Sequence, residues 1–390
     1  MRFWWVVLVS VGGLVCLSLP EAGGAQVPPE TPAVQSAEGI WPITSGPQAP
    51  PETTAVQLAG GMWPITSAAE ANPETTAAQM ISPAAEQAIR RGLGFLAQVQ
   101  AEDGSFGTGP YRGNTGVTAL AGLAFLCSGS TPGRGPYGRQ IDRAIDYLLA
   151  HAQESGLIVS QRGMSHGPMY DHGFAVLFLA ECYGMSRRQD LREKLSRAVQ
   201  LIVATQNQEG GWRYQPRRAD ADISVTVCQV MALRAARNAG LFVPKQTIDR
   251  SIQYVKKSQN PDGGFMYMLS VGGQSEFARS AAALVALYTA GIYDAPEIHK
   301  GLEYLMQFLP QAGQTRREQY YFYGHYYAVQ AMWWAGGPWW NRWFPAIRDD
   351  LLARQRPDGS WTDPICPHTA TAMALIILQL PNNVLPIFQR

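Results

Sequence analysis

The sequence predicts an all-α fold, a single α/α toroid in which six helical hairpins form an inner and an outer ring of helices. Three observations carry this prediction. A turn motif recurs about fifty residues apart, the distance that two helices and their connections occupy. The helix before each turn is amphipathic, whereas the helix after it is apolar on nearly all sides. Inner helices of a ring are buried on both sides, which accounts for this difference.

The repeated turn is a Gln, an acidic residue with Gly, and an aromatic. Its clearest copies are Gln100–Phe106, Gln206–Trp212, Gln259–Phe265 and Gln355–Trp361, and weaker copies lie at Glu154–Gly156 and Gln311–Gly313. Gly can take the positive φ that ends a helix sharply, the acidic residue favours a turn, and the Gln amide can bond backbone groups at the helix end. We interpret the motif as scaffold.

Periodicity places the helices on either side of these turns. The expected outer helices carry their apolar faces around Ile89–Ala97, Ile141–Leu149, Leu195–Val203 and Ile248–Val255. The expected inner helices cover Val117–Leu126, Phe174–Ala180, Val225–Ala236, Ala278–Ala290, Ala328–Ala335 and Thr369–Leu378. If these inner helices run parallel, their first residues meet at one rim of a central cavity.

Two segments precede the predicted toroid of residues 83–390. Residues 1–25 read as a secretory signal peptide, since Arg2 precedes an apolar run and small residues follow it, which predicts a secreted or periplasmic protein. The alternative is an inner-membrane anchor through residues 3–19. Residues 26–82 are rich in Pro, Thr, Ala and Gln and read as a disordered linker, whose Trp-Pro-Ile-Thr-Ser copies are candidates for docking a protein partner.

Charge and cysteine content narrow the function. Lys and Arg number 31 against 30 Asp and Glu, which gives no electrostatic reason to expect nucleic acid as a partner. Cys127, Cys182 and Cys228 lie in apolar helices and are interpreted as buried small hydrophobes, and no Cys-x-x-Cys pair is present.

Aligning the inner-helix starts gives candidate site residues. Taken as equivalent, they are Thr115, His172, Ser224, Phe277, His325 and His368, so that three histidines share one repeat position. Asp222, Tyr323 and Cys366 stand two residues before three of these positions. We predict Asp222, Asp220, Tyr323 and His172 as catalytic residues on this rim. Asn114, Tyr170 and Tyr326 are the expected substrate contacts.

The Gln…Asp-Gly-Ser-Trp repeat resembles that of the prenyltransferase and squalene oxidase repeat superfamily, which includes squalene cyclases and protein prenyltransferase β subunits. The resemblance covers Ala84 to about Leu380. It implies the toroid, with an isoprenoid or other apolar ligand in its cavity.

The prenyltransferase branch implies a zinc site. Tyr323-Gly-His325 stands where that branch has Asp-x-Cys, and His368 matches the family histidine. A rearranged zinc site would use His325 and His368, with Cys366 or His172 as a further ligand.

The cyclase branch implies a proton donor instead. Asp220-Ala-Asp222-Ile-Ser224 resembles the Asp-x-Asp-Asp-Thr that donates the proton in cyclases, with Ile223 in place of the last acid. A paired carboxylate raises the pKa of one partner and makes it a general acid. The alternative is that Asp220 and Asp222 are N-terminal helix caps.

Three functions therefore stay open. The toroid is an exported terpenoid cyclase or prenyltransferase acting on an isoprenoid or other apolar substrate, a binding module without turnover, or a polysaccharide-processing enzyme. The first requires an apolar pocket, and the last requires a wide polar cleft.

Overall fold

The computed structural model describes residues 79–186, 188–311 and 320–389. Within these ranges the chain forms twelve α-helices and no strand, as predicted. The predicted signal peptide 1–25, the alternative anchor 3–19, nearly all of the linker 26–82 and the end of the weak turn at Gln311–Gly313 lie outside the described residues. None of the helices in the described ranges has the length and apolarity needed to span a bilayer.

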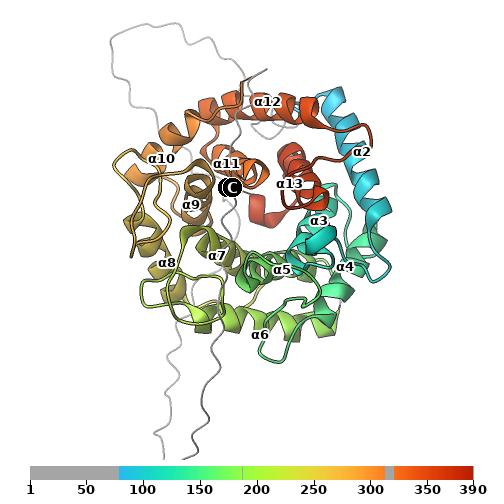
Figure 1. Ribbon diagram of the computed structural model, residues 1–390, viewed down its shortest axis with the longest axis horizontal. Helices are drawn as coiled ribbons and strands as arrows, with labels where there is room; N and C mark the ends of the chain where they lie inside the picture. Colours follow the sequence, from blue (N-terminus) through green and yellow to red (C-terminus); the bar gives the residue numbers. More distant parts are fainter. Residues whose placement is uncertain (1–78, 187, 312–319, 390) are drawn as a thin grey trace, which may run out of the picture. The chain divides into compact units, whose positions relative to one another are not determined.

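The outer ring consists of amphipathic helices, which Figure 1 shows surrounding the others. These helices are α2 (Pro83–Val99), α4 (Gly138–Ala150), α6 (Gln189–Thr205), α8 (Lys245–Lys257), α10 (Pro296–Met306) and α12 (Gly337–Arg354). Their apolar faces pack inward: on α4, Ile141, Ile145 and Leu148 are fully buried, while charged residues cover the opposite face. The last outer helix, α12, packs against the first, α2.

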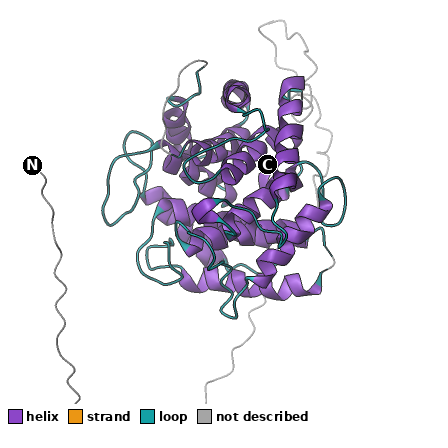
Figure 2. Ribbon diagram, turned by 45° about the vertical axis from the view of Figure 1, so that its right-hand side comes forward, coloured by secondary structure: helices purple, strands orange, loops and turns teal. Residues whose placement is uncertain are grey.

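The inner ring consists of helices buried almost all round. These are α3 (Thr115–Cys127), α5 (Pro168–Tyr183), α7 (Ile223–Asn238), α9 (Phe277–Thr289), α11 (Tyr321–Ala335) and α13 (Pro367–Gln379). Each packs against the next, and α13 packs against α3, so the ring is closed (Figure 1). Figure 2 shows the described residues as helices joined by loops. Several begin earlier than predicted, because their first turns carry tyrosines and polar residues in place of the apolar run. Helix α11, for example, begins at Tyr321 rather than Ala328.

The motif Gln joins neighbouring repeats. The Gln206 amide donates to Gly210 O and to Thr247 O in the next hairpin, both at 2.8 Å. Gln355 does the same across the ring closure, bonding Gly359 O and Ala88 O at 2.9 Å each. Thus the turn of each such repeat is fastened to the outer helix that follows, and the last turn is fastened to the first helix.

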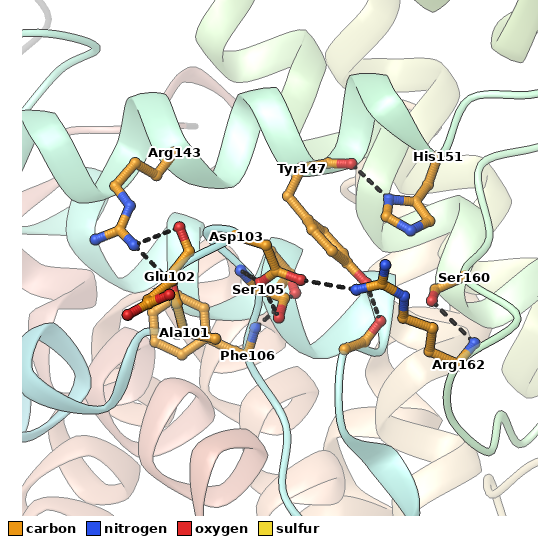
Figure 3. Close-up of polar contacts among 12 residues, drawn as sticks. Ala101, Glu102, Asp103, Ser105, Phe106, Arg143, Tyr147, His151, Ser160 and Arg162 are labelled. Atoms are coloured by element: carbon orange, nitrogen blue, oxygen red, sulfur yellow. Dashed lines mark hydrogen bonds and ion pairs between the residues drawn. The ribbon is translucent and has the colours of Figure 1, made fainter.

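An Arg from the following outer helix adds to this contact. Arg143 of α4 donates to the carbonyls of Ala101 and Glu102 at 2.7 and 2.8 Å, as Figure 3 shows. Arg91 of α2 donates in the same way to Arg356 O at 2.7 Å. The outer helices are therefore tied to the turns by these exposed Arg hydrogen bonds as well as by the buried or half-buried Gln bonds.

On four of the six inner helices, α3, α7, α9 and α13, a hydroxyl anchors the aromatic residue of the turn. Thr226 Oγ1 accepts a hydrogen bond from the backbone N–H of Trp212 at 3.1 Å, and Thr371 Oγ1 accepts one from the backbone N–H of Trp361 at 2.9 Å. The hydroxyls of Thr118 and Ser280 accept the backbone N–H of Phe106 and of Phe265 in the same way. This contact sets the rotation of the inner helix relative to the turn.

Gly359 shows how closely the turn approaches the next helix. Its φ is +90°, and a Cβ added there would lie 2.6 Å from Arg91 O. We expect Gly359→Ala to lower the free energy of unfolding by about 3 kcal/mol, because about 1 kcal/mol of left-handed strain adds to the displacement of α2. Urea unfolding followed by circular dichroism measures this.

Gly129→Ala is the matched control, since Gly129 has φ +85° but no atom lies within 4 Å of the added Cβ. It should lose only about 1 kcal/mol. Equal losses in the two variants would contradict a role of Gly359 in closing the ring.

Candidate functional site

A cavity of about 380 Å³ lies at the N-terminal ends of the inner helices. This volume is within the range of about 300–1,000 Å³ of small-molecule sites. The residues lining it come from all six inner helices or the loops before them: Tyr111, Asn114, Gly116, Val117, Leu120, His166, Tyr170, Asp171, Phe174, Tyr214, Ser224, Tyr267, Glu276, Ala278, Arg279, Tyr320, Tyr323, Ile365, Thr369 and Met373. The predicted single rim is therefore present, and its lining combines aromatic rings with a few polar groups.

The helix position that faces the cavity lies two residues before the position that bonds the turn. On α7 these are Ser224 and Thr226, and on α13 they are Thr369 and Thr371. The cavity-facing position is occupied around the ring by Gly116, Tyr170, Ser224, Ala278, Tyr323 and Thr369. The sequence alignment had mixed these two positions with a third, the residue just before the cavity-facing one, where His368 lies. This changes the interpretation of the histidines.

His172 belongs to the turn-bonding position. Its Nδ1 accepts the N–H of Ile158 at 3.1 Å, and its Nε2 donates to Ala198 O at 3.2 Å. Burial lowers the pKa of His172 to about 4, so the ring is neutral. The side chain is fully buried and does not line the cavity. His172 thus takes the structural place that Thr226 has on α7, and its predicted catalytic role does not fit this position.

The two histidines predicted as metal ligands lie in separate surroundings. His368 Nδ1 accepts the N–H of Gly107 at 2.9 Å, and its ring meets Phe95 and Phe106 edge-on. Burial lowers the pKa of His368 to about 4. His325 packs instead against the rings of Phe277, Tyr321 and Trp343.

The predicted zinc site is therefore not assembled from these residues. The Cys366 thiol hydrogen-bonds the Thr369 hydroxyl at 3.2 Å. Over residues 79–186, 188–311 and 320–389, no three His, Cys, Asp or Glu side chains are grouped so that they could hold a metal ion. The four cysteines of these ranges are free and buried, as expected for Cys127, Cys182 and Cys228.

Asp222 is a helix cap, the alternative that the sequence had left open. Its Oδ1 accepts the N–H of Val225 at 2.9 Å, and its Oδ2 lies 3.9 Å from Arg213 Nε. Burial raises the pKa of Asp222 to about 6, but the side chain does not line the cavity. Asp220 does not cap; it pairs with Arg213 on the outside of the turn.

Three other predicted residues do face the cavity. Tyr323, Tyr170 and Asn114 all line it, and the Tyr323 hydroxyl donates to Ser224 O at 3.2 Å. Tyr326 does not: it is fully buried in the protein core, where its ring meets Phe174 edge-on. Tyr323 faces the cavity from the first turn of α11, whereas Tyr326 lies about one helix turn further along, among core residues.

Asp171 is a site residue that the sequence analysis missed. It lines the cavity, and Asn114 Nδ2 donates to its Oδ1 at 3.0 Å, while Oδ2 has no hydrogen-bond partner. Burial raises the pKa of Asp171 to about 6, although the side chains of Ser165 and Asn114 favour the carboxylate and oppose this rise. Asn114 itself caps α3 by accepting the N–H of Val117 at 2.8 Å. Asp171 therefore places a buried carboxyl, one oxygen of which has no hydrogen-bond partner, at the wall of an aromatic-lined cavity.

Other polar groups on the lining were also missed. Tyr111 and His166 are hydrogen-bonded to each other at 2.9 Å. Arg279 pairs with Glu276, and its guanidinium lies 5.3 Å from the centre of the Tyr267 ring. These residues sit in loops or first helix turns, where periodicity gives no signal.

Comparison with known proteins shows what this domain is similar to. Residues 168–333 match the family model of the squalene-hopene cyclase C-terminal domain. The predicted resemblance to the squalene cyclase superfamily is confirmed, and the chain carries a terpene cyclase-like α/α toroid.

One curated relative is drimenyl diphosphate synthase from Streptomyces showdoensis, 28% identical over 180 residues, which is 46% of this chain and 32% of that enzyme. The chain thus matches about a third of the length of this relative.

Solved structures share the fold at low identity. The type II terpene cyclase MstE from Scytonema, in complex with merosterolic acid A, has a TM-score of 0.53 at 14% identity, over 77% of this chain and 97% of that chain. The α-1,6-mannanase of Salegentibacter sp. HEL1_6 has a TM-score of 0.57 at 8% identity, over 76% and 98%. These similarities establish the toroid fold alone, so the chemistry has to be argued from the residues of the site.

The raised pKa of Asp171 predicts a pH-dependent stability. Because its folded-state pKa is about 6 against 3.8 for a free carboxyl, the folded state loses stability as pH rises from about 4 to 6. Two pKa units correspond to about 3 kcal/mol. Between pH 4 and pH 7, the free energy of unfolding of Asp171→Asn should therefore rise by about this amount relative to that of the wild type.

Urea unfolding of both proteins at a series of pH values measures the difference. Asp294→Asn, a change at an exposed aspartate of the outer surface, is the control and should shift far less. Parallel stability curves for the wild type and Asp171→Asn would show that the Asp171 carboxyl ionises normally.

Proposed function

We propose that the toroid binds an isoprenoid or similar apolar alkene in its cavity and transfers a proton to it from Asp171, in a terpene cyclase-like reaction. The observation that carries this is the free Oδ2 of a buried carboxyl on the wall of an aromatic-lined cavity. The match of residues 168–333 to the squalene-hopene cyclase domain supports the reaction class.

The surroundings of Asp171 suit proton donation. Burial keeps the carboxyl partly protonated in mildly acidic solution, because the pKa of Asp171 is raised to about 6. Asn114 donates to Oδ1, so the proton resides on Oδ2, and the same hydrogen bond stabilises the carboxylate left after transfer.

The aromatic lining suits the cation that protonation of an alkene forms. Tyr170, Phe174 and Tyr323 come from two inner helices and line the same cavity as Asp171. Ring faces attract a cation by about 0.5–2 kcal/mol each when water is excluded. A saturated hydrocarbon would make no use of the acid.

A second candidate is a polysaccharide-processing enzyme, which the shared fold with an α-1,6-mannanase favours. Glycosidases of the common type need two carboxyl groups, and Glu276 is the second carboxyl on the cavity. It is already paired with Arg279, so this candidate ranks below the first.

The proposal predicts that Asp171→Asn abolishes turnover but not binding. Linear prenols of 15 to 30 carbons and their diphosphates, with manno-oligosaccharides as a parallel panel, are incubated with the protein and analysed by mass spectrometry. We expect conversion of a prenyl compound, falling as pH rises through about 6, and a loss of about 10² to 10⁴-fold in Asp171→Asn. Calorimetry should show that the variant still binds the compound.

Asp222→Asn is the matched comparison. Asn caps helices as well as Asp does, so this variant should keep both fold and turnover. Loss of turnover in Asp222→Asn with full turnover in Asp171→Asn would reassign the acid. Binding without conversion in the wild type would favour a binding module, and cleavage of the oligosaccharides would favour the second candidate.

A further inference from the structure

Tyr111 and His166 form a second polar pair on the cavity wall, beside Asp171. Both side chains line the cavity, and Tyr111 Oη lies 2.9 Å from His166 Nε2. Their rings are 5.5 Å apart, centre to centre. His166 is an exposed residue. Neither residue is used by the proton transfer from Asp171.

The backbone holds this pair next to the acid. Met164 N donates to Pro110 O at 2.6 Å, which ties the loop of His166 to the segment of Tyr111. Asn114 Nδ2 donates both to Met164 O at 3.1 Å and to Asp171 Oδ1 at 3.0 Å. One amide therefore connects the acid to the loop that carries the histidine.

The protonation state of His166 suits a base. Burial of part of the ring lowers the pKa of His166 from its ordinary value, so the ring is neutral near pH 7. With its proton on Nε2, His166 donates to Tyr111 Oη and keeps a free lone pair on Nδ1. The Tyr111 oxygen would then stabilise the ring once Nδ1 has gained a proton.

We propose that His166, positioned by Tyr111, is the base that ends the reaction begun by Asp171. This inference rests on the proposed function. The Asp171 O–H bond breaks and a C–H bond forms on one alkene carbon, leaving a carbocation and a carboxylate. His166 then removes a proton from a carbon beside the cation, and that C–H electron pair becomes a new C=C bond. Solvent takes the proton from His166 and returns one to Asp171.

This arrangement restricts the reaction. The product is an isomer of the substrate, because one proton is added and one is lost. The acid and the loop that carries the base are joined through Asn114, which favours loss of the proton close to where it was added. The site therefore favours a double-bond shift or closure of a small ring over a long cascade whose two ends lie far apart.

Deuterium labelling tests the assignment. The full-length protein is incubated in D₂O with farnesol, or with its diphosphate, and the deuterium bound to carbon is measured by mass spectrometry. The wild type should introduce one deuterium per turnover. His166→Gln keeps a hydrogen-bonding amide near Tyr111 but has no base, and it should lower formation of labelled isomer by about 10²-fold. Water capture of the cation should then yield a prenol hydrate.

Two further variants separate catalysis from structure. Tyr111→Phe should give a smaller loss and shift the pH profile of isomer formation, because the hydrogen bond to Nε2 is gone. His299→Gln is the matched control, an exposed histidine on the outer helix α10, and should behave as the wild type does. Thermal unfolding checks that all variants fold.

The outcomes distinguish this inference from the function on which it rests. If Asp171→Asn is inactive but His166→Gln forms labelled isomer at the wild-type rate, the base assignment fails and the proposed function stands. If the wild type incorporates no deuterium into either compound or the other prenyl compounds, the proposed function fails, and this inference fails with it.

Discussion

The hydrogen bonds of one repeated Gln side chain hold this ring together. At Gln100, Gln206, Gln259 and Gln355 the amide bonds the Gly carbonyl of its own turn and a carbonyl in the next outer helix. The bond from Gln355 to Ala88 O crosses from the last repeat to the first. A buried carbonyl without a partner costs about 1–3 kcal/mol, so each bridge favours one spacing of the hairpins. The closed ring follows from a contact that each repeat makes with its neighbour.

The same turn determines which residues reach the cavity. The backbone N–H of its aromatic residue donates to a side chain near the start of the inner helix. This hydrogen bond fixes the rotation of that helix. The residue two positions earlier then points into the cavity, as Ser224 does relative to Thr226. Site geometry is in this sense a consequence of ring assembly. A histidine such as His172 can replace the hydroxyl because its Nδ1 accepts the same kind of N–H.

These contacts explain what the sequence could and could not predict. The six hairpins and the single rim were predictable, because turn motif and helix periodicity are local signals. Helix starts were not, since α5 begins four residues before His172 whereas α13 begins one residue before His368. Equating the two histidines therefore mixed two positions of the repeat. Asp171 was missed for another reason: its partner Asn114 lies 57 residues away, and neither burial nor a free oxygen can be read from a single Asp.

Burial raises the pKa of both Asp171 and Asp222 to about 6, but the two carboxyl groups make different contacts. Asp222 must cap α7 with its own carboxylate, so protonation there weakens a helix end. Asp171 is the fourth residue of α5 and does not cap this helix. Beside it, Asn114 caps α3 through its oxygen and holds Asp171 through its nitrogen. The neutral Asn114 amide thus caps α3 and also contacts Asp171, so the Asp171 carboxyl is not needed as a helix cap.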